Sequence, residues 1–203
     1  MDLCYPLAAK PDGSAARSAC GTQLSRKPLG GTTEFEENRP LSAPLLRERP
    51  FDVLLVFFFC VFATSSLIYE QFIVFGVDLS TTTDIFGRSW YWYARSFDPI
   101  FLDAPLWLRI MCTIDAYVFG AMYLVLIFAF VKGRNWIRIP ALLFASTIVY
   151  STLVYFGWEF FDEANREEAN LLAVFVVNIP YTIVPVLLMW RVRNPEPFSR
   201  RAL

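Results

Sequence analysis

The chain has 203 residues, of which 56% are hydrophobic and only 18% are charged, a balance too apolar for a soluble domain of this size. Its 18 basic and 19 acidic side chains leave a net charge of -1, so no basic field attracts nucleic acid, and nucleic-acid binding is excluded. The chain has no histidine, which removes the most common general base and the histidine-based nucleophile pairs, zinc sites and haem sites.

The cysteines give no sign of a metal site or a disulfide framework. Cys4, Cys20, Cys60 and Cys112 form no C-x-x-C motif, and the last two lie within apolar runs. We therefore expect no metal and no cofactor, and any chemistry would depend on carboxyls, hydroxyls or aromatic rings.

Residues 1–50 differ in composition from the rest of the chain. Pro, Gly, Ser and Thr recur there, both charge signs are mixed, and no apolar period appears. Such a segment cannot bury enough surface to fold alone, so we expect a flexible tail or a docking arm. No secretory signal is predicted, because the first strongly apolar stretch begins near Phe51 and is too long for a signal peptide.

Four long apolar runs follow the tail. Each has about 20 residues or more, the length that a helix needs to cross the hydrocarbon core of a bilayer. They are Val53–Gly76, Trp107–Val131, Ile139–Trp158 and Asn170–Trp190. The sequence thus predicts an all-α integral membrane protein, a bundle of four transmembrane helices over residues 51–195, with a short basic tail at 196–203.

The distribution of Lys and Arg predicts the orientation of this bundle. The segments at the two ends of the chain and the second loop carry 14 of these residues, against 4 on the side of the first and third loops. Because basic residues are enriched on the cytosolic side of a membrane, both termini are expected in the cytosol.

Polar residues recur at one depth in all four predicted spans. Counting the helical rise places them about 9–17 Å from the non-cytosolic face. They are Glu70, Asp115, Ser151, Thr152, Asn178 and Tyr181. Ionisable residues at such a depth usually face the interior of a bundle, so we predict an intramembrane pocket open to the bilayer or the lumen.

Two carboxyl groups in one poorly solvated pocket should not both ionise. One of Glu70 and Asp115 is therefore expected to stay protonated and hydrogen-bonded to the other. The ionised member can hold the ammonium of an amine and the protonated member a ligand hydroxyl, or the pair can deliver and remove protons. Pro180 and Pro185 are expected to free carbonyls near Asn178 and widen the pocket. Candidate aromatic walls are Phe72, Phe119, Phe156 and Tyr181.

Each polar residue also has a purely structural interpretation. Glu70 can extend toward the headgroups, and Asp115 can hydrogen-bond a neighbouring helix. The hydroxyls of Ser151 and Thr152 can bond the carbonyls of their own helix, and Asn178 can join two helices. Their coincidence at one depth favours the pocket over these separate explanations.

Three motifs occur in order along the apolar part of the chain. They are W-Y-A-R-S-F-D-P at 92–99, K-G-R-N-W-I-R-I-P at 132–140, and I-P-Y-T-I-V-P at 179–185 with R-N-P at 193–195. Together they resemble the EXPERA family, in particular its sigma-2 receptor branch, over about residues 51–195. The resemblance implies residence in the endoplasmic reticulum membrane and a cavity that binds sterols and lipophilic amines.

The resemblance also implies roles for single residues. The ligand-contacting acid of helix 1 falls on Glu70, the acid of helix 2 on Asp115, and the aromatic contact of helix 4 on Tyr181. The loop acid that orders the fold falls on Asp98, which the residues alone would place in a turn before Pro99. The polar position one turn after the helix 2 acid is Phe119 here, and the histidine of the family's sterol isomerase has no counterpart.

These observations predict a sterol- or lipid-binding membrane protein that acts in lipid homeostasis. The predicted ligand contacts are Glu70, Asp115, Tyr181, Asn178, Ser151, Thr152 and Phe119, and the structural residues are Asp98, Pro180 and Pro185. One alternative is a sterol delta-8 delta-7 isomerase that uses the carboxyl pair. Another is an accessory subunit of a larger membrane assembly that docks through residues 1–50. A homodimer is implied by family analogy.

Overall fold

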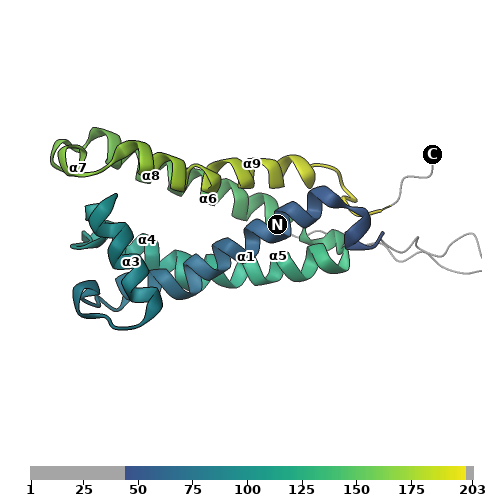
Figure 1. The fold of residues 1–203 in the computed structure, drawn as a ribbon. Coiled ribbons are helices and arrows are strands. Elements are labelled where there is room, and N and C mark those ends of the chain that lie inside the picture. Colours follow the sequence, from purple (N-terminus) through teal and green to yellow (C-terminus); the bar gives the residue numbers. More distant parts are fainter. Residues whose placement is uncertain (1–43, 200–203) are drawn as a thin grey trace, which may run out of the picture. The chain divides into compact units, whose positions relative to one another are not determined.

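The structure is a computed structural model, and it describes residues 44–199. Within that range the chain is helical and contains no strand. Four helical spans are long and apolar enough to cross a membrane, and they run side by side (Figure 1). They are Pro50–Val74, Leu106–Lys132, Asn135–Phe161 and Leu171–Arg191. The predicted all-α bundle of four membrane helices is confirmed.

The first span is a helix interrupted by one wider turn. It consists of α1 (Pro50–Thr64), a π-helical turn η2 (Ser65–Tyr69) and α2 (Glu70–Val74). A 3-10 turn, η1 (Leu46–Glu48), precedes it, so ordered structure begins within the segment predicted as a tail. The remainder of that tail lies outside the described residues.

The second span repeats this architecture. It consists of α4 (Leu106–Ile114), a π-helical turn η5 (Asp115–Phe119) and α5 (Gly120–Lys132). Gly133 ends it in the left-handed conformation, with φ of 61°, which only glycine adopts without steric cost.

The third and fourth spans form a hairpin. The 3-10 turn η6 (Asn135–Ile137) leads into α6 (Arg138–Phe161), and a short α7 (Glu163–Glu168) follows. The fourth span is divided into α8 (Leu171–Asn178) and α9 (Pro180–Arg191).

Two prolines explain why the fourth span is divided into α8 and α9. Pro180 has no N–H to continue the helix, and Pro185 leaves the carbonyl of Tyr181 without its usual partner. The Thr152 hydroxyl on α6, which donates mainly to the Ile148 carbonyl of its own helix at 2.9 Å, lies 3.5 Å from the Tyr181 carbonyl. A neighbouring helix thus places a polar group beside a backbone carbonyl that proline frees inside the membrane.

The first loop is more ordered than the sequence indicated. It contains an amphipathic helix, α3 (Ile85–Ser96), between the 3-10 turns η3 (Leu79–Thr81) and η4 (Pro99–Phe101). Asp84 caps α3 by accepting from the Gly87 amide at 2.8 Å. Because α3 mixes charged and aromatic residues, it contains no long apolar run from which a helix could be predicted.

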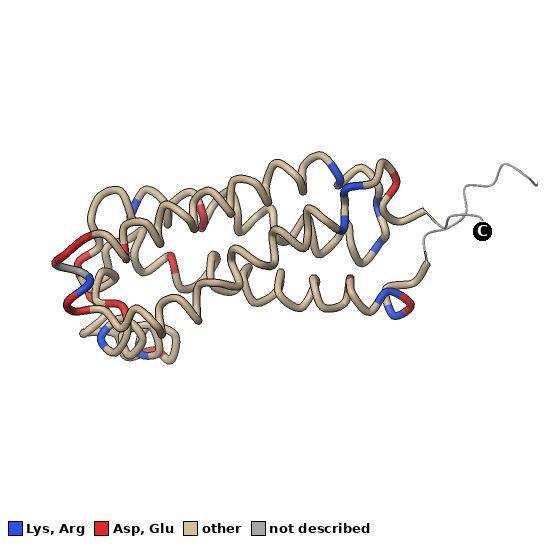
Figure 2. Tube along the Cα trace, turned by 90° about the horizontal axis from the view of Figure 1, so that it is seen from above, with Lys and Arg blue, Asp and Glu red and all other residues tan. Residues whose placement is uncertain are grey.

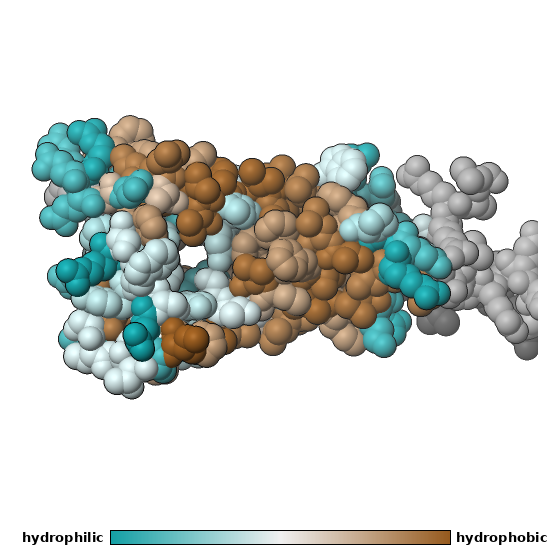
Figure 3. All heavy atoms as spheres, viewed as in Figure 1, coloured by the Kyte–Doolittle hydropathy of each residue, from teal (hydrophilic) through white to brown (hydrophobic). Residues whose placement is uncertain are grey.

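The spans pack as two pairs, α1 with α5 and α6 with α9 (Figure 1). Aromatic rings fill the space between them: Tyr123 contacts Phe62 at 5.6 Å and Phe144 at 5.0 Å between ring centroids. Charged residues gather at the two ends of the bundle, with few along its length (Figure 2). Brown, apolar side chains form the surface between those ends (Figure 3).

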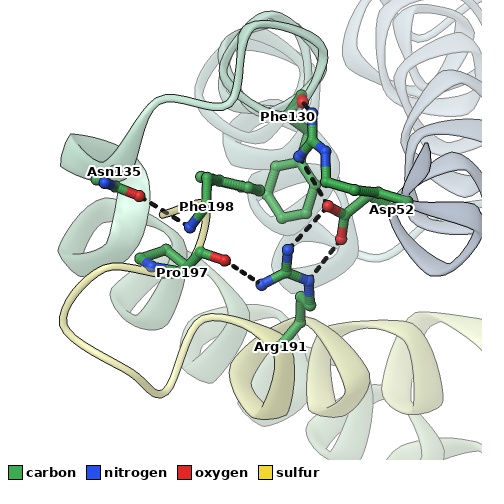
Figure 4. A network of polar contacts seen from close by, with 7 residues as sticks. Asp52, Phe130, Asn135, Arg191, Pro197 and Phe198 are labelled. Atoms are coloured by element: carbon green, nitrogen blue, oxygen red, sulfur yellow. Dashed lines mark hydrogen bonds and ion pairs between the residues drawn. The ribbon is translucent and has the colours of Figure 1, made fainter. Parts of the chain in front are cut away.

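An ion-pair cluster closes the end of the bundle where the first span begins and the fourth ends, here called the base (Figure 4). The buried Asp52 carboxylate accepts two hydrogen bonds from Arg191, at 2.6 and 2.9 Å, and one from Arg49 at 2.8 Å. Arg49 also donates to the Phe130 carbonyl of α5 at 2.9 Å. The first, second and fourth spans are therefore joined at one carboxylate.

The segment after the fourth span folds back onto this cluster. The Phe198 ring is 2% exposed and lies 5.0 Å from each of the Arg49 and Arg191 guanidinium carbons. Its amide donates to Asn135 at 2.9 Å, which adds the third span (Figure 4). Part of the predicted basic tail thus packs against the bundle, and Arg200 and Arg201 lie outside the described residues. The side of the membrane on which the base lies stays a prediction.

The base cluster predicts a large effect of one substitution. Asp52→Ala leaves Arg49 and Arg191 at the base without their carboxylate, which should lower the free energy of unfolding by about 3–5 kcal/mol. Denaturant unfolding in detergent micelles measures this loss. The control is Asp103→Ala, at an exposed loop acid, which should change stability by less than about 0.5 kcal/mol. Equal stabilities of the two variants would contradict the assignment.

Candidate functional site: an acidic cavity among the spans

A cavity of about 330 Å³ lies among the four spans. The side chains predicted as ligand contacts all line it, and they come from all four spans. They are Glu70, Asp115, Phe119, Ser151, Thr152, Asn178 and Tyr181. The polar residues that the sequence placed at one depth thus also lie around one cavity in the structure. Their role as ligand contacts stays a prediction.

The two acids meet across the first and second spans. The Glu70 and Asp115 carboxyls lie close enough to hydrogen-bond each other, and the Cys112 thiol lies beside Glu70. The Ser66 hydroxyl donates to Asp115 Oδ1 at 2.7 Å. A hydrogen bond between two carboxyls requires a proton between them, so a pair joined in this way carries at most one negative charge. Glu70 Oε2 is shielded from solvent and has no hydrogen-bond partner among the described residues.

The π-helical turns place these acids. Glu70 directly follows the π turn of the first span, Asp115 opens that of the second, and the two turns pack against each other. Gly120, directly after the second turn, lies so close to the first span that a Cβ there would meet Leu67 at 2.6 Å. π turns are rare and often occur at functional sites. Here they bring polar groups of two spans into contact at the cavity.

The hydroxyls and the amide on the other two spans have structural partners as well. Ser151 and Thr152 both donate to the Ile148 carbonyl of their own helix, at 3.0 and 2.9 Å. Asn178 donates to the Val174 carbonyl at 2.9 Å and to the Tyr93 hydroxyl of α3 at 3.3 Å. The structural interpretation therefore describes these contacts correctly, while the same side chains also line the cavity.

Aromatic rings form part of the wall. Tyr181 stacks on Phe62 with centroids 4.1 Å apart, and its hydroxyl bonds Ser65. Phe119 packs edge-on against Phe144 at 5.4 Å. Of the other expected walls, Phe72 lines a separate cavity of about 250 Å³ near Arg109, and Phe156 packs against Tyr155, Phe160 and Phe175.

Several lining residues were not predicted. Trp90 and Phe101 come from the first loop, which folds back over the cavity. Tyr155 lies one helical turn after Ser151, so its spacing along the third span was the available signal. Trp90 carried no such signal, because α3 lies outside the predicted spans.

The cavity has an opening toward the lipid-facing surface. Ile114 on α4 and Thr147, Tyr150 and Val154 on α6 line the cavity and are exposed on the outside of the bundle. The opening thus lies between the second and third spans. The space-filling view is hollowed at this level (Figure 3).

Asp98 closes the loop onto the third span. It stands before η4, and its buried carboxylate accepts a hydrogen bond from the Tyr155 hydroxyl. Burial raises the pKa of Asp98 to about 6, although hydrogen bonds from Tyr155 and the Ile100 amide lower it. Burial and the nearby Asp98 carboxylate also raise the pKa of Tyr93. The Asp98–Tyr155 contact therefore joins the loop to the third span, and Asp98 is not among the residues that line the cavity.

Comparison with known proteins identifies the family. The family model EBP, described as EXPERA (EXPanded EBP superfamily), matches residues 85–192. The chain belongs to the EXPERA family. The match contains α3 and the second to fourth spans, and Glu70 lies outside it.

A relative gives a finer comparison. Sigma intracellular receptor 2 of Xenopus tropicalis is 27% identical over 107 residues, which are 48% of this chain and 63% of that protein. The matched segment thus spans less than two thirds of the relative's length. The resemblance to the sigma-2 receptor branch of the EXPERA family is confirmed at this level.

The pKa of Asp98 predicts a pH-dependent stability. The folded state holds this proton more tightly than the unfolded state, where the pKa is near 3.8, so stability is highest below both values. As the pH rises from 4 to 7, the Asp98 contribution should fall by about 2 kcal/mol, most of it below pH 6, and then stay level.

Unfolding of the wild type and Asp98→Asn in detergent between pH 4 and 7 measures this contribution. The Tyr155 and Tyr93 phenols and Glu159 lie nearby in both proteins, so the difference between the two pH profiles isolates Asp98. The exposed-acid variant Asp103→Asn serves as the control and should keep the wild-type profile. Parallel profiles for wild type and Asp98→Asn would contradict the prediction.

Proposed function

We propose that this EXPERA protein binds a sterol or another lipophilic ligand, such as an amphiphilic amine, within the membrane. The main support is that the Glu70 and Asp115 carboxyls lie side by side in an otherwise largely apolar cavity. An apolar wall takes up the hydrocarbon body of such a ligand, while the pair offers one negative charge or one acidic proton to its polar end.

The position of the opening supports a ligand that arrives from the bilayer. Tyr150 and Val154 on α6 lie on the outside of the bundle and on the cavity wall at once. A lipid dissolved in the membrane can enter between the second and third spans without crossing water. The Xenopus relative is named as a receptor, and we extend a binding role, not that protein's ligands, to this chain.

Residence in the endoplasmic reticulum and a role in lipid homeostasis belong to the same proposal. Both follow from the family resemblance, as does a homodimer. Organelle fractionation and the mass of the particle in mild detergent test them.

The carboxyl pair also favours one enzymatic candidate, a sterol delta-8 delta-7 isomerase. That reaction adds a proton to one carbon of an alkene and removes a proton from another, so the sterol is neither oxidised nor reduced. Glu70 and Asp115 lie side by side in a largely apolar cavity, where one carboxyl could give a proton and the other take one, as such a transfer requires. Growth of isomerase-deficient cells that express the chain tests this candidate, and accumulation of the 8-ene sterol would exclude it.

Lipid mass spectrometry on the gently purified protein tests the binding proposal. The wild type should retain a sterol or related lipid above the detergent background, and Glu70→Gln should lose it. Glu163→Gln is the matched control, because it makes the same change on the exposed α7. A cationic amphiphile should bind Glu70→Gln or Asp115→Asn about 10- to 100-fold more weakly, with unchanged thermal stability. Unchanged affinity in both variants would refute the site.

A further inference from the structure

The cavity wall contains a hydrogen-bond donor that no predicted contact uses. Trp90, on α3 in the first loop, lines the cavity. Its indole N–H is shielded from solvent and has no hydrogen-bond partner among the described residues. A buried N–H without a partner is uncommon in proteins, so this one calls for an explanation.

The Trp90 ring is fixed in place by other rings. It stacks on Tyr93 with centroids 5.3 Å apart and planes 9° from parallel, and it contacts Phe101 at 4.9 Å and Tyr69 at 5.6 Å. Tyr93 is in turn held by the Asn178 amide at 3.3 Å. These contacts hold the indole in place at the cavity that Trp90 lines, so its N–H cannot easily turn toward bulk water.

The Glu70 carboxyl, which pairs with Asp115, lines the same cavity. Its second oxygen, Oε2, has no hydrogen-bond partner in the described part of the chain, and Tyr69, which packs on Trp90, is the residue directly before Glu70. The two groups place different demands on a ligand. The carboxyl oxygen accepts a hydrogen bond, or donates one when it carries the shared proton, whereas an indole N–H only donates.

The carboxyl pair alone can bind either an amine or a hydroxyl, but the indole N–H distinguishes between these two classes of ligand. A protonated amine has no lone pair, so it satisfies Glu70 and leaves the indole N–H unpaired. A hydroxyl both donates and accepts, so it offers the acceptor that the indole N–H needs as well as a contact for the carboxyl pair. Because the indole N–H has no partner among the described residues before binding, a hydroxyl gains a hydrogen bond there, whereas an amine neither gains nor loses one.

We propose that Trp90 is a specificity-determining residue that selects, through its indole N–H, a lipid with a hydroxyl oxygen at its polar end. The inference depends on the proposed binding function, because it assigns the polar group of the ligand in that cavity. It also gives α3 a role: the loop helix supplies the hydrogen-bond donor, and the spans supply the acids.

Ligand binding to three forms of the full chain tests this proposal. Trp90→Phe keeps an aromatic ring and removes the N–H, and Trp92→Phe makes the same change at an exposed ring outside the cavity lining. The probes are radiolabelled cholesterol, which carries a hydroxyl, and a lipophilic tertiary amine. Trp90→Phe should bind cholesterol about fivefold more weakly and the amine equally well, and Trp92→Phe should match the wild type for both.

A spectroscopic readout on the wild type observes the indole N–H directly. The chain has six tryptophans, so an indole-¹⁵N-labelled sample gives few signals, and that of Trp90 is the one missing in Trp90→Phe. Cholesterol should move the Trp90 indole proton downfield, and the amine should not.

The outcomes separate this inference from the binding function. Equal cholesterol affinity of the wild type and Trp90→Phe, or an equal loss of both probes, would overturn the role of the indole and leave the binding function standing. Failure of the wild type to bind either probe would overturn both.

Discussion

The bidentate contact between Asp52 and Arg191 is the interaction on which the rest of the bundle depends. It joins the first span to the fourth, which are the ends of the chain's path through the bundle, and Arg49 and Phe198 extend the same cluster to the second and third. A charge pair in an apolar surrounding is costly unless every donor and acceptor is matched, and here one carboxylate receives three hydrogen bonds. Because these contacts fix the four spans to one another at the base, the spans need not pack closely at the level of Glu70 and Asp115, where the cavity lies.

Backbone irregularities define the polar level of that cavity. Two π turns and two prolines interrupt three of the four spans near the same depth. Each interruption changes the direction of side chains or frees a carbonyl, and at Tyr181 the freed carbonyl lies 3.5 Å from the Thr152 hydroxyl of the neighbouring span. Lipid cannot supply hydrogen bonds to such groups, so irregular backbone persists in a membrane only where neighbouring spans or a cavity accommodate it.

The four spans and the common depth of Glu70, Asp115, Ser151, Thr152, Asn178 and Tyr181 could be predicted from the sequence. Both follow from the thickness of the bilayer and the helical rise, which act on each segment separately. The positions of Trp90, Asp98 and Phe198 could not be predicted in this way. Each depends on a segment that folds back onto residues distant in the chain: α3 onto the cavity, Asp98 onto Tyr155, and Phe198 onto two arginines. The π turns also escaped prediction, because their residues continue the apolar period of a helix without a break.

The opening between the second and third spans has a consequence for how affinity is defined. A ligand that enters from the bilayer equilibrates first with the lipid, so occupancy is determined by its mole fraction in the membrane and not by its concentration in water. Each methylene added to such a ligand favours its transfer into the bilayer by about 0.8 kcal/mol, even where it touches no protein atom. Apparent aqueous affinities along a homologous series would thus rise through partitioning alone, and only mole-fraction constants compare what the cavity itself recognises.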